Sequence, residues 1–132
     1  MKLNQANLAS PFWREKGYGL PAFDRAKVVE ATAKNPEWLH LGAGNIFRAF
    51  IAKVMQDTLD AGLAKTGIIV AEGFDYEIVE RAYRAYDNLA VSVSLKSSGQ
   101  IEKTIVGSVT ESLVMDPAQP DWARLAEVLG RP

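Results

Sequence analysis

This sequence of 132 residues contains no cysteine and only one histidine, His40. Without cysteine it cannot form a disulfide, use a thiol nucleophile or bind a metal through sulfur. A single histidine also excludes a metal cluster or a catalytic triad that needs two or more histidines from this chain. We therefore predict no metal site. A cysteine-free composition fits a reducing compartment, and we expect a cytoplasmic location.

An excess of charge of one sign is also missing, because 15 basic and 16 acidic residues give a formal net charge of −1. This balance offers no electrostatic reason to expect nucleic acid or anionic lipid as a partner. No uninterrupted apolar run is long enough to cross a bilayer, and the first residues lack the apolar core of a signal peptide. We therefore expect neither nucleic acid nor a membrane among the partners. The remaining composition is typical of one soluble globular domain.

One segment points to chemistry more clearly than the rest. Residues 39–50 read Leu-His-Leu-Gly-Ala-Gly-Asn-Ile-Phe-Arg-Ala-Phe, a short apolar strand that passes through Gly-Ala-Gly into a helix. In a dinucleotide-binding turn, backbone N–H groups and a helix N-terminus meet a pyrophosphate. Gly42 would make the tight turn, and Gly44 would let the pyrophosphate approach the backbone. The third small residue of the motif would fall at Phe47, so this helix is expected to start differently or to stand further from the sheet.

The neighbouring polar residues leave alternatives open. Arg48 could reach a phosphate or a substrate carboxylate, or it could form an ion pair with Glu72 or Glu111. An acid after the second strand should bind the ribose hydroxyls, and Glu72 and Asp75 are the candidates. Either acid would disfavour a 2′-phosphate, so NAD is preferred to NADP. Asp75 could instead only cap a helix, and His40 is interpreted as a locally hydrogen-bonded residue at a strand end.

Apolar periodicity predicts strands alternating with helices. The expected elements are helix 25–34 capped by Asp24 and ended by Asn35-Pro36, strand 38–41, helix 45–61 ended by Gly62, buried strand 68–71, helix 75–86, a hairpin of 89–95 and 101–106, strand 108–115, and a helix from Asp121, its cap, to Gly130. Such alternation predicts a parallel sheet with right-handed crossovers. The fold class is therefore α/β, the N-terminal part of a doubly wound Rossmann-type sheet with an added β-hairpin.

The two ends of the chain differ from this regular pattern. Residues 1–22 are predicted to be an irregular N-terminal arm that packs its aromatic side chains on a neighbouring surface. Residues 23–132 are predicted to be the N-terminal portion of a nucleotide-binding domain whose second half is missing. Because the chain stops at Arg131-Pro132, directly after a helix, we expect it to be part of a longer protein. The unfinished sheet should expose an edge, and self-association is expected.

The glycine segment and the box Leu-Pro-Ala-Phe-Asp-Arg at residues 20–25 together resemble the polyol-specific long-chain dehydrogenases. That family includes mannitol 2-dehydrogenase, mannitol-1-phosphate dehydrogenase, fructuronate reductase and tagaturonate reductase. The resemblance covers residues 20–115, including the hairpin and residues 106–109. Phe50 stands where mannitol 2-dehydrogenases tend to have histidine, which favours the uronate reductases or a divergent member.

The resemblance implies NAD-linked oxidation of a sugar alcohol or reduction of a keto sugar acid. It places the pyrophosphate against Gly42, Gly44, Asn45, Ile46, Phe47 and Arg48, and the ribose against Asp75. With Ala43 and Glu72, these residues make up the predicted NAD site. The family's catalytic lysine and its asparagine and histidine helpers lie in a largely helical C-terminal domain, and no position here matches them. We therefore assign no catalytic residue, expect this chain alone to be inactive, and expect that C-terminal domain and a small sugar substrate as partners.

Two other functions remain as alternatives. An apolar strand followed by Gly-x-Gly also opens the sites of methyltransferases that bind S-adenosylmethionine. Those proteins usually have an acid before the glycines and a third glycine two residues after the second, whereas His40 and Ile46 occupy these positions here. A non-catalytic nucleotide-binding module is the third possibility.

Overall fold

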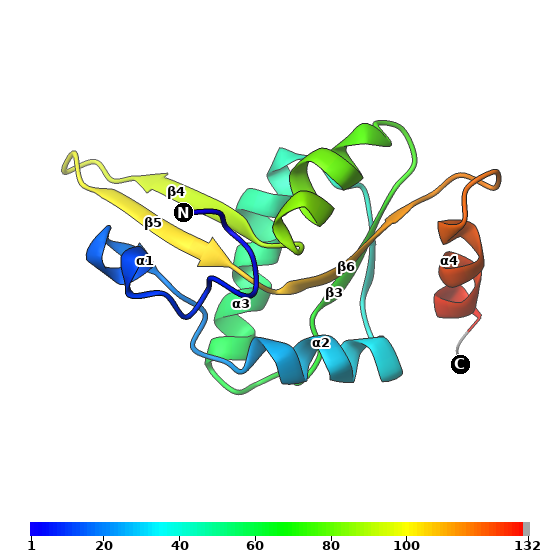
Figure 1. Ribbon diagram of the computed structural model, residues 1–132, viewed down its shortest axis with the longest axis horizontal. Coiled ribbons are helices and arrows are strands. Elements are labelled where there is room, and N and C mark those ends of the chain that lie inside the picture. The colour runs from blue at the N-terminus through cyan, green and yellow to red at the C-terminus, as the bar shows by residue number, and fades with distance from the viewer. Residues whose placement is uncertain (131–132) are drawn as a thin grey trace.

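The computed structural model describes residues 1–130, and two three-stranded sheets organise them (Figure 1). One sheet is parallel, with the order β2-β3-β6, where β2 is Leu39–Leu41, β3 is Ile68–Glu72 and β6 is Val109–Val114. The other has the order β1-β5-β4, where β1 is Tyr18–Gly19, β4 is Ala90–Leu95 and β5 is Ile101–Val106. The predicted parallel sheet and antiparallel hairpin are thus confirmed, and the hairpin belongs to a separate sheet. The last two residues of the predicted domain 23–132 lie outside the described residues.

Helical segments connect the strands. They are α1 (Pro11–Glu15), α2 (Arg25–Lys34), η1 (Phe47–Ile51) continuing into α3 (Ala52–Asp60), η2 (Val79–Tyr83) continuing into η3 (Arg84–Tyr86), and α4 (Asp121–Leu129). Both η1 and η2 are π turns, in which Ala52 N–H donates to the Phe47 carbonyl and Arg84 N–H donates to the Val79 carbonyl. The sequence predicts helices here but not π turns, because a pattern of apolar residues does not reveal a single widened turn.

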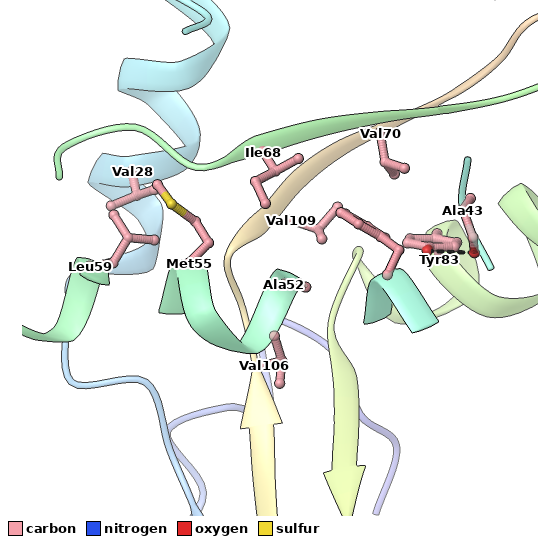
Figure 2. Packing of buried hydrophobic residues seen from close by; sticks show 11 residues of the cluster. Val28, Ala43, Ala52, Met55, Leu59, Ile68, Val70, Tyr83, Val106 and Val109 are labelled. Carbon is pink, nitrogen blue, oxygen red and sulfur yellow. Dashed lines mark hydrogen bonds between the residues drawn. The ribbon is translucent and has the colours of Figure 1, made fainter. Parts of the chain in front are cut away.

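The central strand β3 shows why an uninterrupted apolar run predicts a buried parallel strand. Its side chains alternate between the two faces of the sheet. Ile68 and Val70 join a core cluster with side chains of α3, and Figure 2 shows this packing. Ile69 and Ala71 join a second cluster with Leu125 of α4. Helices therefore cover both faces of the sheet, and neither face is exposed to solvent at Ile68 to Ala71 of β3.

The predicted helix ends are confirmed at three places. The Asp24 carboxylate accepts a hydrogen bond from Lys27 N–H and caps α2, and Asn35 is the C-cap that follows its last residue. Gly62 follows α3 with a φ of +72°, the left-handed conformation that favours glycine at this position. These boundaries depend on neighbouring residues alone, which is why the sequence predicts them.

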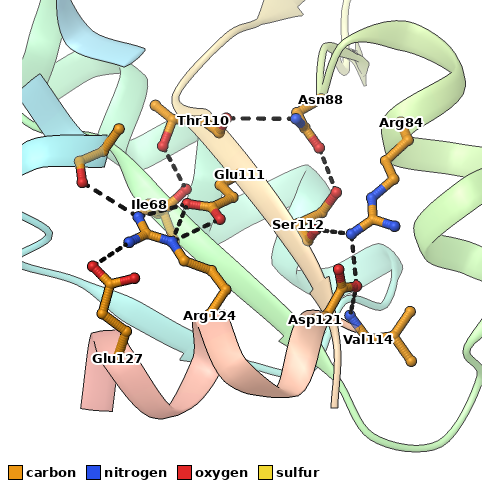
Figure 3. Close-up of polar contacts among 11 residues, drawn as sticks. Ile68, Arg84, Asn88, Thr110, Glu111, Ser112, Val114, Asp121, Arg124 and Glu127 are labelled. Carbon is orange, nitrogen blue, oxygen red and sulfur yellow. Dashed lines mark hydrogen bonds and ion pairs between the residues drawn. The ribbon is translucent and has the colours of Figure 1, made fainter. Parts of the chain in front are cut away.

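Two predicted helix caps are corrected by the structure. Asp121 is the first residue of α4, and its carboxylate accepts from Val114 N–H at 2.8 Å and from Arg84 at 2.6 Å (Figure 3). It therefore ties α4 to the end of β6 instead of capping the helix. At Asp75, the backbone carbonyl rather than the carboxylate accepts the Ile78 N–H. The Asp121 carboxylate thus serves contacts beyond its own helix, whereas the Asp75 carboxylate lies 4.0 Å from Arg81 of η2.

The N-terminal arm is more regular than predicted, since it contains α1 and β1. Its aromatic side chains pack on a neighbouring surface, as the sequence predicts, and the structure shows that this surface is the hairpin. Trp13 is buried in a cluster with Leu89 and Ile105, and Tyr18 lies edge-on to the Trp13 ring. β1 pairs in parallel with β5, so the arm completes the second sheet. The boundary between residues 22 and 23 as a domain division stays a prediction.

A buried arginine joins the two sheets. The Arg25 guanidinium donates to the backbone carbonyls of Asp87, Gly107 and Val109, which surround the passage from β5 to β6. Three carbonyls in different directions suit the planar fork of an arginine. The first residue of α2 thus fixes where the chain leaves the hairpin and enters the parallel sheet.

Candidate functional site

The turn after β2 has the backbone shape that the two glycines predict. Gly42 has a φ of +106°, and its N–H donates to the Ala71 carbonyl at 2.8 Å. A side chain at this φ would be strained. A Cβ placed on Gly44 would meet no neighbouring atom within 4 Å. The turn is therefore anchored to β3 at Gly42 and open to solvent at Gly44.

The helix that follows presents its first amides at the same place. Arg48 N–H donates to the Gly44 carbonyl, which closes the first helical turn. The N–H groups of residues 44–47 precede that bond and have no carbonyl of their own helix to bind. The side chain of Ile46 is 80% exposed, so this end of the helix is not covered by the rest of the chain. Such a helix end attracts anions through its amides and its dipole.

Ala43, between the two glycines, is held at both of its backbone groups. Its N–H donates to Oε1 of Glu72 at 2.7 Å. Its carbonyl accepts from the Tyr83 hydroxyl, also at 2.7 Å (Figure 2). The Ala43 side chain is fully buried. Strand β3 and the π turn η2 therefore both contribute a side chain to the glycine turn.

Glu72 binds two loops at once. Its second carboxylate oxygen accepts from Phe74 N–H at 3.0 Å and from Asp75 N–H at 3.3 Å. Burial raises the pKa of Glu72, but backbone N–H groups from Ala43 and residues 73–75 outweigh that effect, so its pKa lies below the ordinary value. These bonds occupy most of the acceptor positions that a carboxylate offers. Of the two predicted ribose acids, Glu72 thus already serves the structure of the turn.

Asp75 is the more available acid. Its side chain is half exposed, and its carboxylate lies 4.0 Å from Arg81. Because its own N–H binds the same Glu72 carboxylate as Ala43 N–H, Asp75 lies at the same edge of the sheet as the glycine turn. The structure thus brings both predicted acids beside the predicted pyrophosphate residues.

Phe47 faces the interior instead of the open side of the turn. Its ring is buried and stacks on the His40 ring, with centroids 4.3 Å apart and an angle of 18° between the planes. Burial lowers the pKa of His40, which favours a neutral ring. The predicted local hydrogen bond of His40 is replaced by this stacking. Phe47 begins the π turn η1, so the helix departs from regular geometry where the third glycine of the motif is missing.

The alternative ion pairs of Arg48 are wrong. Its guanidinium donates to the side-chain carbonyl of Asn45 and lies 5.6 Å from the centre of the Tyr83 ring. Glu111 instead binds Arg124 at 3.0 Å (Figure 3). Arg48 and Asn45 also line a cavity of about 700 Å³ that is bounded by η2 and β4. The Arg48 charge therefore stays beside the turn without an acidic partner among these contacts.

Tyr83 is the residue at this site that the sequence reasoning missed. Apolar periodicity places Tyr83 on the apolar face of the predicted helix 75–86 and indicates no other role for it. A buried tyrosine usually needs a partner for its hydroxyl, and that need was the signal that could have pointed to a polar role. Within residues 1–130, no cluster of three or more potential metal ligands is present, and none of the helices could span a membrane.

Comparison with known proteins extends this description. No family model matches the chain. The "D-mannonate oxidoreductase" of Thermotoga maritima is 43% identical over 133 residues, which cover 100% of this chain and 25% of that protein. The mannitol 2-dehydrogenase of Pseudomonas fluorescens, in a ternary complex with NAD and D-mannitol, matches 100% of this chain with a TM-score of 0.79 and 21% identity. These matches agree with the resemblance to the polyol-specific long-chain dehydrogenases.

A second solved structure, a D-sorbitol dehydrogenase in substrate-free form, matches 98% of this chain with a TM-score of 0.76 and 21% identity. At such identity the solved structures establish the fold alone, and they confirm the predicted Rossmann-type α/β class. The chain spans about a quarter of the length of each relative. All three proteins are named as a dehydrogenase or an oxidoreductase.

Proposed function

We propose that this chain is the NAD-binding portion of an oxidoreductase that transfers a hydride between NAD and a sugar substrate. The substrate would be a sugar alcohol or aldonate in one direction and the keto sugar or keto uronate in the other. Since the chain spans about a quarter of its relatives, cofactor binding is proposed for these residues and the reaction for the family's complete enzymes. Their catalytic C-terminal domain is the partner that the proposal requires.

The open space at Gly44 carries this proposal. A pyrophosphate needs several N–H donors and a backbone without side chains in its way. The turn offers both, because no atom crowds Gly44 and the amides of residues 44–47 precede the first bond of the helix. The chain therefore fits the cofactor, which supplies hydride acceptance or donation when it is bound. The half-exposed Asp75 carboxylate beside the turn favours NAD over NADP, because it would repel a 2′-phosphate.

The substrate class has weaker but specific support. The relative from Thermotoga maritima is named for D-mannonate, the anion of a sugar acid. Phe50, where mannitol 2-dehydrogenases tend to have histidine, agrees with a uronate reductase. We therefore propose an aldonate and keto-uronate pair, as in fructuronate reductase, ahead of a neutral polyol. A cytoplasmic location and self-association of the chain belong to the same proposal.

The test is NADH binding, measured as energy transfer from tryptophan to NADH in the wild-type chain and in Gly44→Asp. The introduced carboxylate would lie against the pyrophosphate, so we expect the dissociation constant to rise at least about tenfold. Gly99→Asp adds the same charge at the tip of the hairpin and should leave NADH affinity unchanged. NADPH should bind more weakly than NADH. Failure of the wild-type chain to bind NADH, or equal affinity in Gly44→Asp, would refute the proposal.

A further inference from the structure

The inference starts from Tyr83, a buried polar residue that the proposed function does not use. Its side chain is 2% exposed and packs in the same core cluster as Phe47 and Val70. Its hydroxyl donates to the Ala43 carbonyl, 40 positions earlier in the chain. Burial raises the pKa of Tyr83, so the hydroxyl remains a hydrogen-bond donor throughout the neutral range. The contact joins the second helical connection to the first.

The geometry of a peptide unit explains why this contact matters for Gly44. The Ala43 carbonyl and the Gly44 N–H belong to one planar trans unit, so they point in opposite directions. The Tyr83 hydroxyl holds that carbonyl toward the core (Figure 2). The Gly44 N–H must then point away from the core, at a residue where a Cβ would also meet no atom within 4 Å. One buried hydroxyl therefore sets the direction of an amide at the open side of the turn.

Two further contacts lie next to this peptide unit. The Glu72 carboxylate accepts the Ala43 N–H and prevents the preceding peptide from turning. The Arg48 guanidinium lies over the Tyr83 ring and places its charge beside the same turn. Tyr83 itself ends the π turn η2, a kind of distortion that is frequent at functional sites. The turn is thus held from β3 on one side and from η2 on the other.

We propose that Tyr83 is a positioning residue for the cofactor, whose hydroxyl orients the Ala43–Gly44 peptide so that Gly44 N–H faces the pyrophosphate. The inference rests on the proposed binding of NAD. Because the ring is buried, Tyr83 acts through the peptide and does not touch the cofactor. Without the hydroxyl, the peptide is free to rotate, and the cofactor must order it on binding.

The experiment compares Tyr83→Phe with two control variants of the full chain. Tyr83→Phe keeps the ring and removes the hydroxyl, and we expect the NADH dissociation constant to rise about threefold to tenfold, as for the loss of one hydrogen bond. Tyr86→Phe removes a hydroxyl from a partly exposed ring on η3 and should leave the affinity unchanged. Val79→Ala destabilises the same π turn without removing a polar group, and it should lower the melting temperature while leaving NADH affinity unchanged.

A spectroscopic readout separates positioning from stability. In the absence of NADH, the amide resonance of Gly44 should shift in Tyr83→Phe and stay in place in Val79→Ala. If Tyr83→Phe does not fold, NADH titration of the wild-type chain decides the question, because binding at Gly44 should shift the resonances of the buried Tyr83 ring. Absence of that shift overturns the inference.

The outcomes also distinguish this inference from the proposed function. A wild-type chain that does not bind NADH refutes the proposed function. A wild-type chain that binds NADH, with equal affinity in Tyr83→Phe and an unmoved Gly44 amide, refutes only the positioning role of Tyr83.

Discussion

The two sheets of this protein use similar residues for different purposes. In the parallel sheet, the middle strand β3 is buried from Ile68 to Ala71. In the hairpin sheet, Val91 and Val93 of β4 are exposed, as is Leu95 at its end. Valine and isoleucine are abundant in both. Apolar composition alone therefore does not decide which strand forms the core.

The connections between strands explain the difference. Parallel neighbours need a crossover, and the crossover helices cover the faces of the sheet. The strands β4 and β5 are joined by a short turn over residues 97–100, which is too small to cover a face of the hairpin as a crossover helix would. The crossovers also bring the candidate site together, because the glycine turn and Glu72 lie at the carboxyl ends of neighbouring parallel strands. None of the predicted cofactor residues lies in the hairpin.

The largest expected difference between the sheets comes from replacing a glycine by alanine in each. At Gly67, just before β3, a Cβ would stand 2.3 Å from the Ser108 carbonyl oxygen and 2.7 Å from the Thr110 side chain. Ser108 directly precedes the neighbouring strand β6, and Thr110 lies in it, so neither can move without disturbing the sheet. We therefore expect Gly67→Ala to lower the free energy of unfolding by about 3 kcal/mol or more. Urea unfolding of Gly67→Ala and of a matched variant in the hairpin measures the two losses of stability.

The matched variant is Gly99→Ala at the hairpin turn. Gly99 has a φ of +83°, but a Cβ at this position would have no neighbouring atom within 4 Å. Only backbone strain opposes the alanine, and we expect a loss of about 1 kcal/mol. Equal losses at the two glycines would contradict the contrast between a tightly packed sheet and an open one.

A smaller effect is expected from shortening one valine in each sheet. Val70 is 0% exposed in β3, whereas Val93 is 57% exposed in β4. Val70→Ala removes buried methyl groups and leaves a cavity, which should lower the free energy of unfolding by about 2 kcal/mol. Val93→Ala should change it by less than about 0.5 kcal/mol. A loss of more than about 1 kcal/mol in Val93→Ala would show that this face of the hairpin is covered in solution.

The smallest effect concerns two carboxylates with lowered pKa values. Backbone N–H groups lower the pKa of Glu72 against the opposing effect of burial, and the Lys96 ammonium lowers the pKa of Glu102 in the hairpin. A lowered pKa in the folded state stabilises the protein above the ordinary value of 4.5. That contribution is lost as the pH falls from 4.5 through the folded pKa. Both Glu72→Gln and Glu102→Gln should therefore flatten the fall in stability toward acid pH.

Salt distinguishes the two carboxylates. The exposed pair of Glu102 and Lys96 is screened by ions, so the effect of Glu102→Gln should disappear at high ionic strength. The direct backbone hydrogen bonds of Glu72 are short-range, and the effect of Glu72→Gln should persist. Acid unfolding followed by circular dichroism at low and high salt measures both. Equal salt sensitivity in the two variants would contradict the assigned causes.

Much of the fold follows from local pattern. The buried strand at Ile68–Glu72, the hairpin, and the helix ends at Asp24 and Gly62 were all predicted, because each depends on periodicity or on a few neighbouring residues. The cap at Asp121 was predicted wrongly for the opposite reason. Its carboxylate binds Val114 N–H and Arg84, and the packing of α4 on the sheet brings these groups together.

The candidate site divides in the same way. The open glycine turn was predicted from its two glycines, and its geometry agrees. The role of Glu72 as a link between two loops and the contact from Tyr83 to Ala43 were not predicted. Glu72 and Tyr83 lie 29 and 40 positions after Ala43 in the sequence, and no local sequence pattern indicates pairings over such separations. The assignment of individual residues to NAD stays a prediction.

By itself, the sequence determined an alternation of strands and helices, a glycine turn at the end of the first parallel strand, and the resemblance to one dehydrogenase family. These depend on short-range sterics and on the periodicity of apolar residues. Only the tertiary structure decided that the hairpin forms its own sheet with the arm, and that Phe47 stacks on His40. It also decided that Ala43 is held between Glu72 and Tyr83. The physical reason is that buried polar groups must find partners wherever packing brings them, regardless of their separation along the chain.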